Sequence, residues 1–237
     1  MTSLNRRLAW GALLNIRDLG GLSCGDTFIK PGRLIRASMM GELTDGGRAA
    51  MRAHGIRTVI DLRGQDEVAA EASPYRDGMS YRHTPFMSAR IMALHLAAHD
   101  GTLADELRRI AQPGGGLGEA VGAIADADPG IVLHCAAGRD RTGIVVATVL
   151  AAIGVPDAEI VADYVASDEE LVEEYERFKR ANPDRAADVD QGVAKRAWVM
   201  GEVLATLRSA FGGAGPYLRL AGVTDRQLAG IRAKLTA

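Results

Sequence analysis

The chain has 237 residues, 47% of them hydrophobic, which is enough to bury the core of one sizeable domain. Its formal net charge of −2 argues against a general affinity for nucleic acid, so no nucleic-acid partner is expected. Only two cysteines, Cys24 and Cys135, are present, which excludes a disulfide framework and fits a reducing, cytoplasmic setting.

The N-terminal residues carry only a faint targeting pattern. Arg6-Arg7 precedes the apolar run Leu8 to Leu14, but this run is short and no small-residue cleavage site follows it. No run approaches the ~20 apolar residues that a membrane span needs, so integral membrane association is not expected. We therefore interpret residues 1–237 as a single cytoplasmic domain, and leave secretion without a signal open.

The apolar pattern predicts strands and helices in alternation over the first two thirds of the chain. We expect strands at Ile56 to Leu62, at Met79 to Pro85 and from Ile131, and helices at Asp45 to His54, Thr102 to Ala111 and Leu117 to Ala127. The last third is predicted to be helical, with helices ending at Gly154, starting at Pro156, and covering Asp168 to Arg180, Asp190 to Phe211 and Thr224 to Leu235. This order is typical of an α/β fold with a mostly parallel central sheet flanked by helices and a helical C-terminal third.

The most informative stretch is the loop His134-Cys-Ala-Ala-Gly-Arg-Asp-Arg-Thr-Gly143. An apolar run precedes it and a longer one follows, so strand, tight loop and helix come in order. Backbone N–H groups at the start of such a helix converge on an anion, helped by the helix dipole. Ala136 and Ala137 leave room there, and Gly138 lets the backbone bend its amides inward. The stretch therefore predicts a phosphate-binding loop with a thiol at its rim.

Cys135 is the candidate nucleophile of this loop. A helix N-terminus and adjacent cations favour a thiolate, which attacks phosphorus to form a cysteinyl-phosphate that water then hydrolyses. Arg141 can place two N–H bonds on phosphate oxygens, the Thr142 hydroxyl is a candidate partner of the sulfur, and His134 a candidate for ordering the loop backbone. A buried, inert cysteine is the alternative for a lone Cys, but the spacing of Cys, Gly, Arg and Thr-Gly argues against it. Cys24 receives no role.

The loop resembles the signature H-C-x-x-G-x-x-R-[ST]-G of cysteine-dependent protein tyrosine phosphatases and matches it at every specified position. Asn15 to Gly21, Pro31 to Ser38 and Gly55 to Arg63 are similar to segments of the bacterial and fungal branch called tyrosine-phosphatase family 3. Tyr217 to Leu235 resembles the C-terminal helix of that branch. The resemblance implies the phosphatase fold, hydrolysis of a phosphotyrosyl protein, and inorganic phosphate as product.

Three assignments of the general acid stay open. Many tyrosine phosphatases take it from an Asp on a separate loop, but here the stretch from His83 to Ser88 holds no Asp. Asp140, inside the loop, is the first candidate. Asp61, at the end of a predicted strand, is the second, with a structural partnership to Arg63 as its alternative. The third assignment is that no residue serves, because a good leaving group needs little protonation.

Substrate contacts are expected from the loop residues Ala136, Ala137, Gly138, Arg139, Asp140 and Arg141. The resemblance associates a basic-Asp-Arg loop with phosphoinositides, so these and phosphoserine or phosphothreonine are further candidate substrates. The alternative for Arg139 is a solvent-facing side chain paired with a surface acid. Residues 90–116 combine apolar positions with a Gly-rich hinge, and predict either a helical lid over the pocket or a helix packed on the sheet.

Two other functions compete with hydrolysis. Rhodanese-type sulfur transfer also uses a cysteine at a strand–loop–helix anion site, although the Arg141-Thr-Gly ending and the N-terminal motifs point away from it. A phospho-ligand-binding protein that kept the loop but lost its acid stays open because no Asp follows Pro85. We expect no cofactor, and no metal because the histidines form no metal-ligand spacing.

Overall fold

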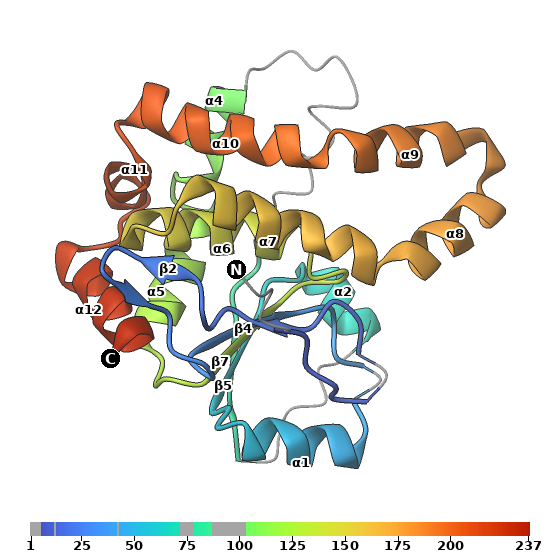
Figure 1. Cartoon of the computed structure of the whole chain (residues 1–237), viewed down its shortest axis with the longest axis horizontal. Coiled ribbons are helices and arrows are strands. Elements are labelled where there is room, and N and C mark those ends of the chain that lie inside the picture. The colour runs from blue at the N-terminus through green and yellow to red at the C-terminus, as the bar shows by residue number, and fades with distance from the viewer. Residues whose placement is uncertain (1–5, 12, 42, 72–77, 87–102) are drawn as a thin grey trace.

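The computed structural model describes residues 6–11, 13–41, 43–71, 78–86 and 103–237. A central sheet has the strand order β1-β4-β7-β5-β6, parallel throughout except for β1, which pairs antiparallel with β4 (Figure 1). Its strands are β1 (Arg17–Asp18), β4 (Leu34–Ala37), β5 (Thr58–Asp61), β6 (Ser80–His83) and β7 (Ile131–His134), and β2 (Ser23–Cys24) forms a separate hairpin with β3 (Thr27–Phe28). The predicted mostly parallel sheet is confirmed.

Helices make up most of the remaining described chain. They are α1 (Asp45–Ala53), α2 (Gln65–Ala70), α4 (Leu103–Ile110), α5 (Leu117–Asp126), α6 (Asp140–Ile153), α7 (Asp157–Glu170), α8 (Val172–Ala181), α9 (Ala186–Ala194), α10 (Arg196–Phe211), α11 (Ala214–Leu220) and α12 (Asp225–Thr236), with a 3-10 turn at Pro183–Arg185. Thr224 caps α12 as predicted, since its side chain accepts a bond from the Gln227 N–H.

Two of the predicted helices have different bounds. The helix expected at 168–180 is the end of α7 followed by α8, because Leu171 leaves the helical region and is buried. The helix expected at 190–211 is split between α9 and α10 at Lys195. The chain reverses at the 3-10 turn Pro183–Arg185, so that α8 and α9 form a pair extending past the end of the sheet (Figure 1).

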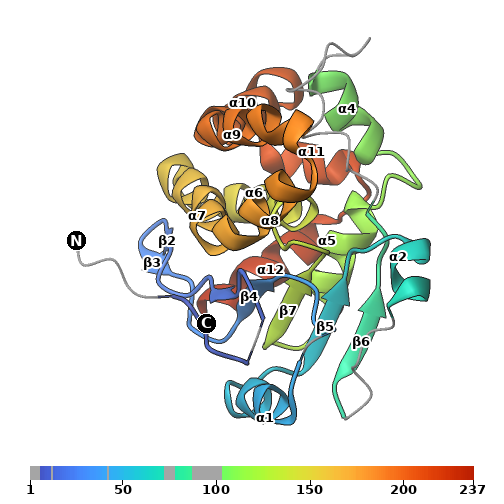
Figure 2. The ribbon, with the colours of Figure 1, turned by 90° about the vertical axis from the view of Figure 1, so that its right-hand side faces the viewer.

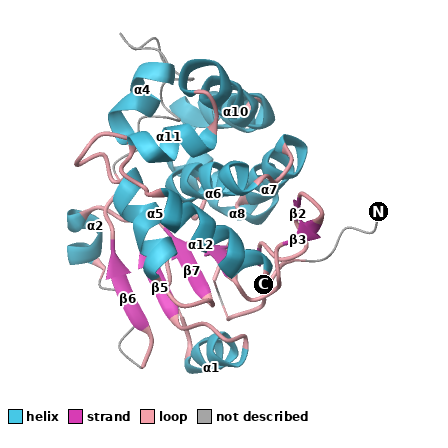
Figure 3. Cartoon of the chain, turned by 90° about the vertical axis from the view of Figure 1, so that its left-hand side faces the viewer, coloured by secondary structure: helices cyan, strands magenta, loops and turns pink. Residues whose placement is uncertain are grey.

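Four strands of the sheet, β1, β4, β5 and β7, are fully buried, whereas the edge strand β6 is partly exposed. In β7, Ile131 and Leu133 point into the larger core and Val132 into the smaller one, which is the alternation of an extended strand. α5 and α12 cover the larger core (Figure 3), and Figure 2 shows the strands from the other side, with α1 at their lower end. Trp10, from the N-terminal segment, packs in the smaller core. Such two-sided burial explains why the strand before the loop is almost wholly apolar.

The segment for which a lid was considered, residues 90–116, is only partly described. Residues 87–102 lie outside the described part of the chain. The remainder contains α4, which packs against α10, with Leu107 and Ile110 fully buried. The hydroxyl of Tyr217 donates to the Leu107 carbonyl at 2.7 Å. The described part of this segment is therefore an ordinary packed helix.

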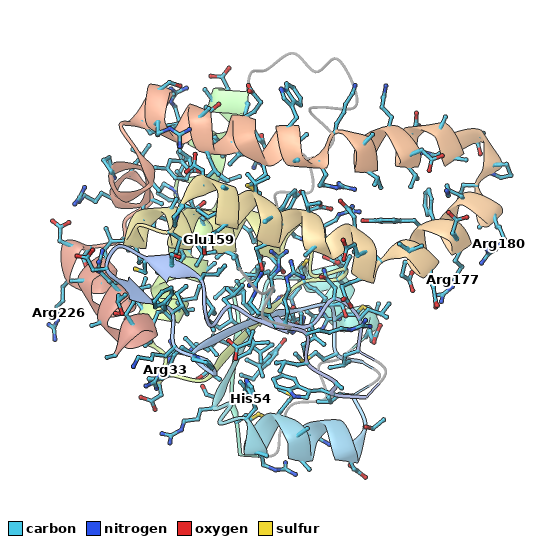
Figure 4. All side chains as sticks on the ribbon, viewed as in Figure 1. Arg33, His54, Glu159, Arg177, Arg180 and Arg226 are labelled. Atoms are coloured by element: carbon cyan, nitrogen blue, oxygen red, sulfur yellow. The ribbon has the colours of Figure 1, made fainter. Side chains whose placement is uncertain are left out.

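α8 lies at the opposite end of the molecule from α12. Figure 4 shows Arg177 and Arg180 on α8 at that end, and Arg226 on α12 at the other. Within the described ranges, no helix has the length and apolar character needed to cross a membrane.

Candidate active site

The loop between β7 and α6 lies at the carboxyl end of the parallel strands. β7 is the central strand, with Ala37 of β4 and Asp61 of β5 in register with His134 on either side. Cys135 follows at once and is only 2% exposed. Gly138 has φ of +66°, and a Cβ at this position would lie 2.2 Å from the carbonyl oxygen of Ala37. Only glycine meets both requirements, so the loop can lie tightly against β4.

Three successive carbonyls of the loop point outward. The donors are the Met39 N–H to Ala136 at 2.7 Å, the Asn15 side-chain amide to Ala137 at 2.8 Å, and the Arg36 guanidinium to Gly138 at 2.8 Å. In a planar trans peptide the N–H points opposite to the C=O. The N–H groups that follow these carbonyls, those of residues 137, 138 and 139, are therefore turned to the inside of the loop. This arrangement is a nest for an anion.

A buried cluster behind the loop holds these donors in place. The carboxylate of Asp163 on α7 forms ion pairs with three arginines. The N···O distances are 2.9 Å to Arg6, 3.0 Å to Arg17 and 2.7 Å to Arg36. Burial by itself raises the pKa of Asp163, but the guanidiniums outweigh it and hold the pKa well below its ordinary value. Burial and the charge of Arg36 lower the pKa of Arg17 to about 10. The Asp163 carboxylate thus holds three arginines in place, and one of them, Arg36, donates directly to the loop.

Asn15 is oriented by the same cluster. It adopts φ of +50°, a left-handed conformation that asparagine tolerates better than most residues. Arg17 donates to its side-chain oxygen in a short bond, which leaves the amide nitrogen to face Ala137. The first family-like motif, beginning at Asn15, therefore braces the loop from behind.

Arg141 is held by a carboxylate of α2. Its two terminal nitrogens lie 2.5 and 2.7 Å from the carboxylate oxygens of Glu67, which also accepts from the Gly64 N–H at 2.7 Å. The hydrogen bond from Arg141 is the largest cause that holds the pKa of Glu67 below its usual value. Burial lowers the pKa of Arg141, while Glu67 and the nearby Cys135 sulfur raise it by more. The guanidinium is thus firmly cationic and lies beside the thiol.

Arg139 and Asp140 pair with each other inside the loop. Two guanidinium nitrogens of Arg139 lie 2.9 Å from the two carboxylate oxygens of Asp140, and a third donates to the Tyr175 hydroxyl on α8. The Tyr164 hydroxyl donates to Asp140 at 3.3 Å. The carboxylate partner of Arg139 is therefore its neighbour Asp140, and 18% of the Arg139 side chain is exposed.

Asp61 pairs with Arg63, the structural partner that the sequence analysis offered as the alternative to an acid role. Arg63 donates to both its oxygens, at 2.8 to 3.1 Å, and the Tyr81 hydroxyl donates at 2.9 Å. Burial raises the pKa of Asp61, but the bonds from Arg63 and the charge of His134 lower it by more. Asp61 is therefore a buried carboxylate held by fixed donors.

His134 and Thr142 are both fully buried. The Nδ1 atom of His134 lies 3.2 Å from the Cys135 carbonyl oxygen, so Nδ1 carries the proton, because a carbonyl only accepts. Burial lowers the pKa of His134, against the opposing effect of Asp61. The Thr142 hydroxyl has no hydrogen-bond partner among the described side chains and backbone groups.

A groove with a volume of about 770 Å³ opens beside the loop and reaches it at Ala136, Ala137 and Arg139. Apolar wall residues are Leu13, Leu14, Met39, Leu171, Phe178 and Val189. Its cations are Arg139, Arg177, Arg185 and Arg196, and its acids are Glu71, Glu173, Glu174 and Asp188. Four of each sign leave the groove without a net charge. Residues of α8 and α9 form much of its wall.

The residues predicted from the signature lie together, but several contacts were missed. Asn15 and Arg36 stood inside quoted motifs without a role, although an arginine between the apolar residues of a strand is itself a signal for a buried partner. Glu67, Asp163 and Tyr175 lie on three different helices. Among these, only Tyr175 carries a signal, because it is one of two aromatic residues in a strongly charged helix.

A buried thiol, inward-turned amides and an arginine in one loop are the groups that a cysteine-dependent phosphatase needs. The chain belongs to the tyrosine phosphatase family, whose sequence profile matches residues 8–237. It is 33% identical to the triple specificity protein phosphatase PtpB of Mycobacterium tuberculosis, over 89% of this chain and 92% of that one. It is 31% identical to a tyrosine-protein phosphatase of Nostoc commune, over 90% of this chain and 77% of that one.

A comparison of structures finds P. aeruginosa TpbA in complex with phosphotyrosine, with a TM-score of 0.37 and 15% identity, over 77% of this chain and 91% of that one. The family membership and the two sequence relatives establish the activity: the protein is a protein tyrosine phosphatase that hydrolyses phosphotyrosine. Neither sulfur transfer nor binding without catalysis is favoured by them.

Proposed function

We propose that Cys135 is the nucleophile that removes the phosphoryl group from phosphotyrosine, with the loop amides and Arg141 holding the phosphate. The observation that carries this proposal is the set of three outward carbonyls at Ala136, Ala137 and Gly138, because it turns three N–H donors toward one anion. These donors and Arg141 stabilise the charge on the equatorial oxygens as the Cys135 sulfur attacks phosphorus.

Two steps then complete the reaction. The Cys135 sulfur forms a bond to phosphorus while the bond to the tyrosyl oxygen breaks, and Asp140 gives that oxygen its proton. Water next attacks the cysteinyl-phosphate, Asp140 takes a proton from this water, and the sulfur leaves as thiolate with release of inorganic phosphate. Asp140 is anionic beside Arg139 in the free protein, and the arriving phosphate dianion raises its proton affinity. We assign Asp61 and His134 to holding the backbone and Thr142 to a hydrogen bond with the sulfur.

The nucleophile is tested by Cys135→Ser, with Cys24→Ser as the matched control. Cys24 is also buried, and its thiol donates to the Ile153 carbonyl at 3.0 Å, a bond that serine can make. We expect Cys135→Ser to lose all measurable hydrolysis of p-nitrophenyl phosphate and to keep phosphate binding, while Cys24→Ser stays active. Turnover by Cys135→Ser would refute the mechanism.

The acid is tested by Asp140→Asn on two substrates with different leaving groups. General acid catalysis contributes typically 10²–10⁴-fold, so we expect roughly a 10²-fold loss on a phosphotyrosyl peptide and a much smaller loss on p-nitrophenyl phosphate. We expect Asp61→Asn to lower the thermal stability and to slow both substrates to the same extent. A leaving-group dependence in Asp61→Asn and not in Asp140→Asn would reverse the assignment.

For the substrate, we propose phosphotyrosine in proteins as the preferred class, with phosphoserine and phosphothreonine slower. Two observations support this: Cys135 is nearly inaccessible, which favours a long aryl side chain, and the groove is apolar with balanced charge. The name of the mycobacterial relative, triple specificity protein phosphatase, makes a phosphoinositide the second candidate, favoured by Arg139 at the rim. This order of preference is tested by measuring the rates for a phosphotyrosyl peptide, a phosphoseryl peptide and a phosphoinositide side by side. A phosphoinositide rate above that of the phosphotyrosyl peptide would reverse the order.

A further inference from the structure

A continuous chain of hydrogen bonds runs from α10 to the catalytic loop. Arg196 donates to Asp168 at 3.1 and 3.3 Å, and the Tyr175 hydroxyl donates to the same carboxylate at 2.8 Å. Arg139 donates to the Tyr175 oxygen and, with its two other nitrogens, to Asp140. Four helices and the loop thus meet in one ordered network.

The direction of these bonds is determined by chemistry. The hydroxyl hydrogen of Tyr175 is committed to Asp168, so its oxygen can only accept, and Arg139 can only donate. The guanidinium lies 5.3 Å above the Tyr175 ring centre as well, a cation–π distance. Because the guanidinium is planar, holding one terminal nitrogen on Tyr175 presents the other edge to Asp140.

We propose that Tyr175 is a positioning residue for the hydrolysis: from α8 it holds Arg139 edge-on to Asp140 and so determines how readily Asp140 keeps its proton. This inference rests on the proposed role of Asp140 as proton donor. Without the Tyr175 hydroxyl, Arg139 loses its anchor and turns toward the groove, its pairing with Asp140 weakens, and Asp140 stays protonated to higher pH.

The electrostatics around Asp140 agree with this geometry. Burial raises the pKa of Asp140, and Arg139 is the largest of the causes that bring it below its usual value. The other groups that face this carboxylate are Arg141 from the loop, Tyr164 from α7 and Arg196 from α10, with Asp168 beyond Tyr175. When only the Tyr175 oxygen is removed, Arg141, Tyr164 and Arg196 remain, and Asp168 loses one donor but keeps Arg196.

The test is Tyr175→Phe, which removes one oxygen and keeps the ring that lines the groove. The matched control is Phe178→Leu, one turn further on α8, on the same groove and not bonded to Arg139. The titration of the Asp140 carboxyl carbon is followed by NMR in ¹³C-labelled protein. We expect its midpoint to rise in Tyr175→Phe by at least about 0.5 unit, a threefold change in proton affinity, and to stay in place in Phe178→Leu.

The rate profile provides the second measurement. Activity on a phosphotyrosyl peptide is lost at high pH as the acid ionises in the complex, so the basic limb of kcat should move to higher pH in Tyr175→Phe alone. An Asp140 midpoint that does not rise in Tyr175→Phe overturns the inference. If the midpoint rises while Asp140→Asn retains full turnover of the peptide, the role of Tyr175 stands and the proposed acid fails.

Discussion

Replacing Asp163 by Asn removes the carboxylate that pairs with Arg6, Arg17 and Arg36, and this change should be severe. The side chains of Asp163 and Arg36 are each 1% exposed, so water cannot take the place of the lost charge. Breaking a buried ion pair from one side typically costs about 3–5 kcal/mol, because a charge is left uncompensated. For a domain of this size the same loss lowers the melting temperature by roughly 6–20 °C.

The loss should depend on pH in a defined direction. The folded-state pKa of Asp163 is depressed, so its contribution to stability is complete above the unfolded-state pKa of about 3.9 and fades as the pH falls toward the folded value. An asparagine at position 163 does not ionise, so it makes no pH-dependent contribution to stability. The difference in unfolding free energy between the two proteins should therefore narrow by roughly 0.7 kcal/mol between pH 6 and pH 3.5.

Urea unfolding of both proteins at the two pH values measures this difference. Asp157→Asn is the matched control, because it lies on the same helix and its pair with Arg208 is about half exposed. An exposed pair contributes about 0–1 kcal/mol, so the control should unfold close to the natural protein. A loss below about 1 kcal/mol in Asp163→Asn at pH 6, or a gap that widens at pH 3.5, would refute the reasoning.

Two further changes act on the loop itself. Gly138→Ala should abolish phosphate binding and lower kcat by at least about 10²-fold. The added Cβ would lie 2.2 Å from the Ala37 carbonyl oxygen, so the loop and its inward amides would have to move. Near-normal phosphate affinity by calorimetry would contradict this. Glu67→Gln should bind inorganic phosphate about two- to fivefold more tightly in inhibition assays, because the neutral amide competes less for Arg141 and no longer repels the dianion. Weaker inhibition by phosphate would mean that Glu67 chiefly orients Arg141.

The parts of the fold that the sequence predicts well are those determined by local pattern. β7 and α6 follow from long apolar runs, and α12 from the cap at Thr224. β1, β2 and β3 have two residues each, too few for any periodicity, so they were not predicted as strands. β4 contains a buried charge, Arg36, whose partner lies 127 residues further along the chain. No local pattern can pair the two.

The candidate site divides in the same way. Cys135, Gly138 and Arg141 follow from spacing, because one loop must present all of them to a single phosphate. Glu67 and Tyr175 depend on how separate helices pack against that loop, which spacing does not encode. The charged run at Asp168 to Arg180 is typical of a solvated helix, so the sequence gives no signal that α8 lines a groove. Some of these charges line the groove.

The bracing of the loop also has a consequence for synthesis of the protein. Asn15 leaves the ribosome 122 residues before Ala137, the loop residue it holds, and Arg17 leaves it 146 residues before Asp163. Until α7 has emerged, the arginines of the N-terminal third have no carboxylate from Asp163 and the amides of the loop have no defined direction. A nascent chain of this phosphatase should therefore be unable to act on phosphoproteins near the ribosome, and should acquire activity only once nearly three quarters of its length has emerged.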